Sequence, residues 1–589
     1  MTNSEVPISP VASGVRNGRP KKLHGRAFYE SIGSPRHIVA PMVDQSEFAW
    51  RMLTRSFLPP DQRTSVLAYT PMLHARLFVD SPRYRTSHFE AVKGGTDQLQ
   101  DVDVSGNLPP YLDGNPLIDR PLFVQFCAND PEALLGAARK VAPYCDAVDL
   151  NLGCPQGIAR KGHYGAFLQE EPELIYKLIR TLHENLDVPV TAKIRLLDTP
   201  EASLQYARTV LSAGASILTV HGRRREQKGH MTGIADWKML RYLRENLPKE
   251  TVLFANGNVL EHGDVERCLE ATGFDGVMSA EGLLSNPALF SPPPPLAETT
   301  LDQPATAATT AASTASAVTP ADQDYYWPTT DACREYWTSS RKGSRRGGWR
   351  IDAVMRRYLD ILHVYCLGKA SPPVRAPLFI PGDPVERLVE DPTTTATADD
   401  DASTDGPARK KRRTNGSGDT PASTAPARDK DANKEIFASP NFVAVQAHLF
   451  HLLRHAVAKH TDIRDALART RKGDMAGYEH ILSMLEKRIG QALVAGEDKE
   501  FSEEWEADDP EVDDDATEIL DDPDSSAAAV RRCKRPWWVV QPILRPMPAE
   551  ALAKGAIQLK KKVKAELDHA VKAETATVEI EAAAAAAPA

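Results

Sequence analysis

Asp149-Leu150-Asn151-Leu152-Gly153-Cys154-Pro155-Gln156 carries an apolar strand into a tight turn that presents an amide and a thiol together. Gly153 and Pro155 stop the strand, so Cys154 lies at its exit, a position where folds handle small ligands. A lone cysteine in a turn is also explained as an ordinary buried residue. The neighbouring segments must distinguish a functional thiol from a structural one.

Seven further apolar runs of the same kind accompany this strand. Each β-branched run is followed by a helical stretch, which is typical of parallel strands covered by helices. Eight such runs in about 250 residues predict a (β/α)8 TIM barrel, with a doubly wound open sheet as the alternative. The eight runs are His37–Met42, Ser65–Tyr69, Leu122–Phe126, Ala147–Asn151, Val190–Ile194, Ile217–His221, Val252–Asn256 and Gly276–Ala280.

Polar residues at the ends of these runs favour the barrel over the open sheet. In a barrel the carboxyl ends of all strands converge on one mouth, so polar residues placed there share a single site. Surface polar residues would not be placed so regularly. The residues concerned are Gln125, Asn151, Lys193, His221 and Asn256.

The last two strands run into the glycine-bearing turns Asn256-Gly257-Asn258 and Ala280-Glu281-Gly282. Loops at this place in a barrel often bind phosphate through backbone amides, and glycine allows the close approach this requires. Lys193 and His221 would face these loops, with Gln125 as an amide partner. Such a set suits a phosphorylated planar ring such as flavin mononucleotide (FMN), although a structural ion pair within the barrel would also explain the charged residues.

These strand ends and turns resemble those of the tRNA-dihydrouridine synthases, flavin-binding barrels that reduce a uracil ring in tRNA. The resemblance covers the whole barrel, and its segments occur in the correct order. Pro155-Gln156 with Gly162-His163-Tyr164-Gly165 is most similar to the eukaryotic branch that acts on D-loop positions 16 and 17, the NAD(P)+ enzymes. The matching segments are Ala40–Asp44, Thr70–Met72, Asp149–Gln156, Gly162–Ala166, Lys193–Arg195, His221–Arg223, Asn256–Asn258 and Ala280–Gly282.

The resemblance implies a role for individual residues. Asn151 would hold the uracil and Cys154 would protonate it. Hydride from reduced flavin adds to carbon 6, and the enolate then needs a proton at carbon 5, which a thiol protonated at neutral pH can supply. The residues implied to contact FMN are Pro41, Met42, Val43, Gln125, Lys193, His221, Asn256, Gly257, Asn258, Ala280 and Glu281.

Two other functions fit the same residues. A flavin barrel could act on a free small molecule, or the chain could bind tRNA without catalysis. The reductant is expected to be NADPH or NADH; because no GxGxxG follows a strand, it would have to enter the same mouth after the product leaves.

Composition bounds the remaining expectations. Seven scattered cysteines without CxxC pairs argue against a disulfide framework and a zinc site, and no apolar run is long enough to span a bilayer. We therefore expect an intracellular, soluble protein that binds no metal and no membrane. As a separate expectation, the enzyme is taken to be monomeric. The net charge of −9 is a poor guide to partners, because much of the acid lies in Glu503–Asp524.

Composition and periodicity also predict the domain organisation. A disordered tail (1–34) precedes the barrel (35–291), a Pro/Ala/Thr-rich linker (292–345) follows, and a disordered insert (376–436) divides a helical domain (346–375 and 437–495). The chain would end in an acidic and Ala/Lys-rich tail (496–589). The helical periodicity rests on Val354, Tyr358, Ile361, Tyr365, Val445, Leu449, Leu452, Ala456, Tyr478, Ile481, Leu485 and Ile489.

Basic residues predict where tRNA phosphates are met. The cluster Arg223-Arg224-Arg225, just past His221, is the first candidate, and Arg454 leads a set on the helical domain that also includes Arg356, Arg357, His455, Lys459 and Arg464. An ordinary solvated basic face is the alternative. The basic run Arg409–Arg413 resembles a nuclear import signal, but such a run can also bind RNA. The protein is therefore expected in the cytoplasm, the nucleus or both. Trp537 and Trp538 either stack on bases or dock the tail on a domain.

Overall fold

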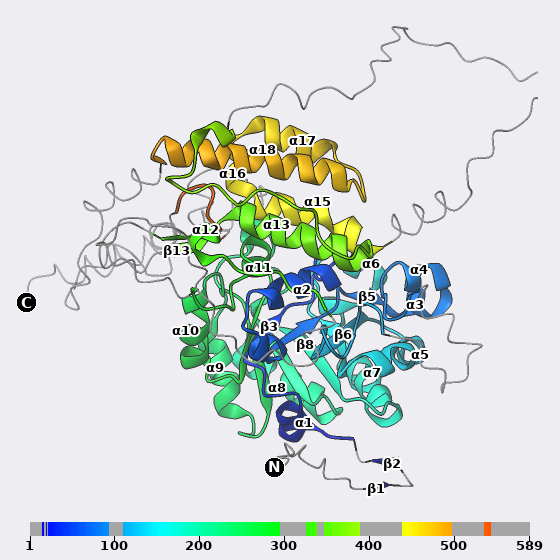
Figure 1. Cartoon of the computed structure of the whole chain (residues 1–589). Helices are drawn as coiled ribbons and strands as arrows, with labels where there is room; N and C mark the ends of the chain where they lie inside the picture. Colours follow the sequence, from blue (N-terminus) through cyan, green and yellow to red (C-terminus); the bar gives the residue numbers. More distant parts are fainter. Residues whose placement is uncertain are drawn as a thin grey trace, which may run out of the picture.

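The computed structural model describes residues 15–16, 19–20, 22–93, 110–294, 325–338, 347–388, 439–497 and 535–542. Figure 1 shows a strand barrel ringed by helices, with a second group of helices lying against it. The barrel occupies the first half of the chain, and the second group comes from the later segments.

Eight parallel strands form the closed barrel, as the sequence predicted. Each strand pairs with the next around the ring, β3 pairs with β11, and pairing of β4 with β6 completes the circle. A two-residue strand, β5 (Leu73–His74), adds to β6 in parallel. The eight strands are β3 (His37–Val39), β4 (Val66–Tyr69), β6 (Leu122–Cys127), β7 (Ala147–Leu152), β8 (Val190–Leu196), β9 (Ile217–Arg224), β10 (Val252–Asn256) and β11 (Gly276–Ser279).

Helices cover the outside of the barrel with apolar faces at helical spacing. In α7 (Pro172–Asn185), Ile175, Leu178 and Leu182 are buried, and proline opens the helix where no N–H donor is needed. The others are α2 (Phe48–Ser56), α3 (Ala75–Asp80), α4 (Pro82–Thr86), α5 (Pro131–Val141), α6 (Gly157–Gly162), α8 (Pro200–Ser212), α9 (Trp237–Asn246), α10 (His262–Thr272) and α11 (Glu281–Ser285).

A helix occupies part of the predicted N-terminal tail. α1 (Gly25–Ser31) buries Phe28 and Tyr29, and Phe28 stacks on Phe123 at the start of β6, with 5.8 Å between the ring centroids. The Tyr29 hydroxyl donates to the carbonyl of Asp275, just before β11. The barrel boundary therefore lies before residue 35, because two aromatic side chains cover the end of the barrel opposite its mouth. The short strands β1 (Val15–Arg16) and β2 (Arg19–Pro20) precede it.

The second group of helices lies where the apolar periodicity predicted helices. Its buried residues share one hydrophobic cluster with the interior of the barrel, so the two units pack as a continuous core. The helices are α13 (Ile351–Ile361), α15 (Pro440–Leu452), α16 (Arg454–Lys459), α17 (Thr461–Arg469) and α18 (Met475–Val494). α13 and α15 both contact α2 of the barrel.

Parts of the predicted linker, insert and tail also pack on these helices. The predicted linker contains α12 (Ala332–Glu335), and an antiparallel strand pair lies at its end, β12 (Tyr336–Thr338) with β13 (Gly347–Trp349). In the predicted insert, Leu378 and Phe379 are buried. Trp537 and Trp538 are buried too, which favours docking of the tail over base stacking. These boundaries differ from the prediction because isolated aromatic residues anchor short segments that carry no helical or strand period. The basic run 409–413 and the acidic run 503–524 lie outside the described residues.

Within the described ranges, no helix is long and apolar enough to cross a membrane.

Candidate functional site

A cavity of about 870 Å³ opens at the carboxyl end of the barrel strands. Seven of the residues predicted to contact FMN line it: Met42, His221, Asn256, Gly257, Asn258, Ala280 and Glu281. The strand order brings them together, because β3, β11, β10 and β9 are neighbours in the ring and end at the same mouth. The volume is within the range of pockets for cofactor-sized ligands.

Gln125 lies deeper, in a buried chain of polar side chains inside the barrel. Its Nε2 donates to Asp149 Oδ2 at 2.8 Å, and its Oε1 accepts from Asn151 Nδ2 at 2.8 Å. Thr191 Oγ1 donates to the other oxygen of Asp149 at 2.6 Å. The strand register explains the chain, since Gln125, Asp149 and Thr191 are direct neighbours on β6, β7 and β8.

Asn151 shapes the turn that carries Cys154. Its Oδ1 accepts the backbone N–H groups of Gly153 at 3.0 Å and Cys154 at 2.9 Å. The Cys154 carbonyl accepts from the N–H of Ala166 at 3.1 Å, and the Cys154 side chain is half-buried. Asn151 thus uses both ends of its amide within the protein and holds the thiol at the strand exit; its predicted contact with uracil stays a prediction.

Lys193 lies beside Asn151 on the neighbouring strand β8. Burial, with the nearby Arg195, lowers its pKa to about 7, although Asp149 and Cys154 oppose the shift. Burial raises the pKa of Asp149 to about 6, and its hydrogen bonds from Thr191 and Gln125 limit the rise. Burial therefore disfavours the charged forms of both the lysine and the carboxyl group at the base of the site.

His221 is uncharged in this environment. Burial and the positive charges of Arg195, Lys193 and Arg223 hold the pKa of His221 well below its ordinary value. Its Nε2 lies 3.0 Å from Arg223 Nη1, an arrangement in which the guanidinium donates and the neutral ring accepts. His221 can therefore offer its ring to a ligand as a neutral hydrogen-bonding group.

The turn after β10 has a backbone that requires glycine. Gly257 has φ of +117°, and a Cβ there would lie 2.6 Å from the Cβ of Ala235. Asn258 also has positive φ, at +61°, and its Oδ1 accepts from the Ala235 N–H at 3.1 Å. The turn is thereby fixed at the wall of the cavity.

Arg223 belongs to this wall and not to an exposed rim. Its Nη2 donates to Asn258 Oδ1 at 2.7 Å and to the Gly233 carbonyl at 2.9 Å. Arg223 thus supports the turn after β10, and its predicted contact with RNA stays a prediction.

The other predicted RNA contacts lie at the surface. Arg224 is exposed, with its Nη1 3.3 Å from Asp198 Oδ1. Arg225 lies over the Phe167 ring at 5.3 Å and pairs with Glu170. Arg454, at the start of α16, is exposed.

Several basic residues of the helical domain make internal contacts instead. Arg357 is buried and donates to the Ser56 carbonyl of the barrel at 2.8 Å, and Arg356 pairs with Glu486. Burial of Arg357 argues against its predicted contact with tRNA, whereas Arg356 is partly exposed and its predicted contact stays a prediction. Lys459 pairs with Glu497, and Arg464 with Asp465.

Arg195, Lys228 and His451 are among the cavity residues that were not predicted as ligand contacts. Arg195 follows Lys193 by two positions on one strand, so the period of two places both on the same face and could have revealed it. Arg195 Nε donates to the Gly153 carbonyl at 2.8 Å, next to Cys154. Lys228 and His451 come from a loop and from a distant helix, and no local pattern indicates them. Of the predicted contacts, Pro41, Val43, Gln125 and Lys193 are not part of the cavity wall, and the Val43 side chain is exposed.

Within the described residues, no group of His, Cys, Asp or Glu side chains could hold a metal ion.

A parallel barrel with cationic, amide and thiol side chains at its mouth is the architecture of a TIM-barrel enzyme. Residues 38–323 match the family model described as Dihydrouridine synthase (Dus). A human relative named tRNA-dihydrouridine(20a/20b) synthase, NAD(P)+-like, is 34% identical over 43% of this chain and 70% of its own length. The chain belongs to the dihydrouridine synthase family.

Two yeast relatives are more similar in sequence. The Saccharomyces cerevisiae protein named tRNA-dihydrouridine(16/17) synthase, with NAD(P)(+) in its name, is 56% identical over 48% of this chain and 60% of that protein. The Schizosaccharomyces pombe protein of the same name is 54% identical over 46% of this chain and 61% of its own length. The chain thus spans about three-fifths of the length of these relatives.

Proposed function

We propose that this protein is a flavin-dependent tRNA-dihydrouridine synthase that reduces uridines at D-loop positions 16 and 17, with NADPH or NADH as the reductant. The observation that supports this proposal most directly is the Cys154 turn, which holds a half-buried thiol beside Lys193 at the mouth of the barrel. The names of the yeast relatives support the positions and the nucleotide reductant. We further propose that the enzyme acts as a monomer in the cytoplasm, the nucleus or both, which light scattering and localisation of the tagged full chain would test.

The cavity fits FMN by its size and its polar groups. Amides of Asn256 and Asn258 and the cationic Arg195 line a space of about 870 Å³ with the neutral His221. The close approach of Gly257 to Ala235 leaves room for backbone but not for a side chain at the turn. These groups would hold a phosphate and the edge of a planar ring.

The protein's own residues supply the proton and the orientation. When bound, the reduced flavin supplies a hydride to carbon 6 of uracil. Cys154 then donates its proton to carbon 5, and the positive charge of Arg195, together with the protonated form of Lys193, stabilises the thiolate that is left. Asn151 keeps the thiol in place through the two backbone bonds of the turn.

The uridine must leave its stack to reach the barrel mouth. A base inside a helix cannot enter such a pocket, so the enzyme would take a nucleotide splayed out of a loop. His451 and Gln45 lie where the helical domain meets the cavity, so an entering nucleotide would pass between the two units.

Position-resolved mapping of dihydrouridine in tRNA tests the proposal. Cells that lack this protein should lose dihydrouridine at positions 16 and 17, and the purified protein with NADPH should restore it on unmodified tRNA. Reduction of free uridine at a comparable rate would favour the small-molecule enzyme. Tight tRNA binding with no reduction by the flavin-loaded protein would favour a non-catalytic binding protein.

Gly257→Ala should weaken flavin retention. The substitution forces alanine into positive φ and against Ala235, at a cost of about 1–3 kcal/mol. We expect at least about tenfold faster FMN release, followed by fluorescence after dilution of the holo-protein. Gly263→Ala is the control, since its Cβ would meet no atom within 4 Å. Equal release from both variants would exclude the Gly257 turn from flavin binding.

Arg224→Ala and Arg454→Ala should each weaken tRNA binding without changing its sequence preference. A lost phosphate contact reduces the slope of log K against log salt by about 1. Filter binding at several salt concentrations measures it. Arg180→Ala, which removes an exposed partner of Glu184 on α7, is the control. An unchanged slope in both test variants would remove them from the tRNA surface.

A further inference from the structure

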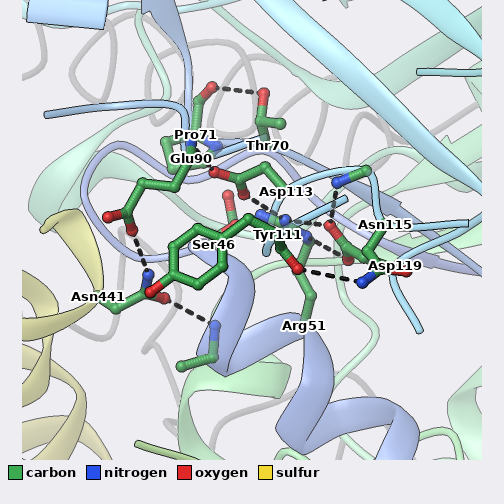
Figure 2. A network of polar contacts seen from close by, with 12 residues as sticks. Ser46, Arg51, Thr70, Pro71, Glu90, Tyr111, Asp113, Asn115, Asp119 and Asn441 are labelled. Atoms are coloured by element: carbon green, nitrogen blue, oxygen red, sulfur yellow. Dashed lines mark hydrogen bonds and ion pairs between the residues drawn. The ribbon is translucent and has the colours of Figure 1, made fainter. Parts of the chain in front are cut away.

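Helix α2 of the barrel is capped by a residue of the helical domain. The second residue of α2, Ala49, has an N–H group that lies too early in the helix for an intrahelical partner. Asn441 Oδ1, at the start of α15, accepts this N–H at 2.8 Å, and both residues are buried. A polar group nearly 400 positions away in sequence thus satisfies the first turn of α2 (Figure 2).

Asn441 is itself held in one orientation. Its Nδ2 donates to Glu90 Oε2 at 3.0 Å, and the Ser439 hydroxyl donates to the same oxygen at 2.8 Å. Figure 2 shows Asn441 between Glu90 and the α2 backbone. The amide therefore cannot turn away from Ala49 without breaking a second buried bond.

His448, which lies on α15 like Asn441, holds the loop that precedes α2. Its side chain is fully buried, stacks on Trp50 with ring centroids 4.0 Å apart, and places Nε2 3.1 Å from the Gln45 carbonyl. A carbonyl only accepts, so Nε2 carries the proton and Nδ1 accepts from the Tyr358 hydroxyl at 2.7 Å. Burial lowers the pKa of His448 to about 3, so this neutral tautomer persists at physiological pH.

The loop held in this way forms part of the cavity. Met42 and Gln45 both line it, and the Met42 N–H is in turn fixed by Ser46 Oγ at 3.1 Å. On the barrel side, Arg51 Nη1 donates to the Ser46 carbonyl at 2.7 Å. The segment Met42–Ala49 is thus fixed by α2 on one side and by α15 on the other.

We infer that Asn441 and His448 are positioning residues for the flavin site, acting through the backbone of Met42–Ala49. The inference rests on the flavin function proposed above. It gives the helical domain a second role besides contact with tRNA, because the shape of the cofactor pocket then depends on docking of α15.

Two isosteric substitutions of one residue test this inference. Glutamine places an N–H donor near the position of Nε2, and asparagine places one near Nδ1. In the full-length holo-protein, His448→Asn should release FMN about tenfold faster than wild type, whereas His448→Gln should stay within about twofold. Release is followed by the rise of FMN fluorescence on dilution, without tRNA or NADPH, so catalysis plays no part in the readout.

Asn441→Ala provides an independent variant, with Leu485→Ala as its control. Leu485 is fully buried in α18. Its replacement by alanine removes packing from the helical domain and leaves the residues of the Met42–Ala49 segment unchanged. We expect faster FMN release from Asn441→Ala and not from Leu485→Ala when both are compared below their unfolding temperatures.

Each result of these FMN-release measurements either supports or contradicts the positioning role of Asn441 and His448. Equal release from wild type, His448→Asn and Asn441→Ala would overturn the inference, as would equal acceleration by His448→Asn and His448→Gln. If a His448 variant does not fold, the Asn441 pair decides alone. Wild-type protein that binds no FMN would instead overturn the proposed flavin function, which is a distinct result.

Discussion

Cys154→Ala should retain its yellow flavin and lose dihydrouridine formation. The side chain lies at the strand exit and is not part of the cavity wall that would hold the cofactor, so its removal leaves the FMN contacts in place. Loss of a positioned general acid costs about 10²–10⁴-fold in rate. We expect single-turnover reduction of tRNA to fall by this factor, while the flavin absorbance per protein is unchanged.

Cys127→Ala is the matched control for this experiment. Cys127 lies in the same small cluster as Cys154, but it is buried, and burial raises its pKa to about 12. The control should keep near-normal turnover. Full activity in Cys154→Ala would contradict the assignment of the thiol as proton donor, and loss of flavin from that variant would show that the turn supports the cofactor.

Asp119→Ala should unfold the barrel under mild conditions. Asp119 is fully buried and accepts from Arg51 Nε at 3.0 Å (Figure 2). It also accepts from Arg55 Nη1 at 2.7 Å and from the Gly114 N–H at 2.9 Å. Its removal leaves two buried guanidinium groups without this counter-charge. Breaking a buried pair in this way costs about 3–5 kcal/mol, which is a large part of the stability of a typical domain.

Chemical denaturation measures this effect, with Asp198→Ala as the control. Asp198 pairs with Arg224 at 3.3 Å on the surface, where an ion pair contributes about 1 kcal/mol or less. A denaturation midpoint for Asp119→Ala as high as that of the control would contradict the importance of the buried network.

The same carboxylate predicts how stability depends on pH. Burial alone would raise the pKa of Asp119, but Arg51 and Arg55 outweigh it and hold the pKa below the ordinary value. A depressed pKa means that the unfolded state binds the proton more readily, so this contribution is present above the ordinary aspartate pKa and is lost as the pH falls through the folded value. We expect the difference in stability between wild type and Asp119→Ala to shrink in acid.

Local patterns predicted much of the site. The β-branched runs end in polar residues at regular places, and a parallel barrel brings all such ends to one mouth, so His221, Asn256 and Cys154 could be assigned to one region from the sequence. Roles within the region were harder to predict. Asn151 and Arg223 were expected to meet substrate, and the structure adds internal bonds that the sequence did not reveal, because a polar side chain looks the same in sequence whether its partner is a ligand or a neighbouring backbone.

The barrel, the order of its strands and the polar residues at its mouth could be predicted from local patterns, because parallel strands alternate with a period of two and their carboxyl ends meet at one mouth. The residues from distant segments that complete the site were visible in the folded arrangement alone. Asn441 and His448 satisfy backbone groups of α2 and its loop, and Phe28 and Tyr29 cover the far end of the barrel. Such contacts depend on how separate elements dock, and a single buried amide or ring carries no period that would reveal its partner.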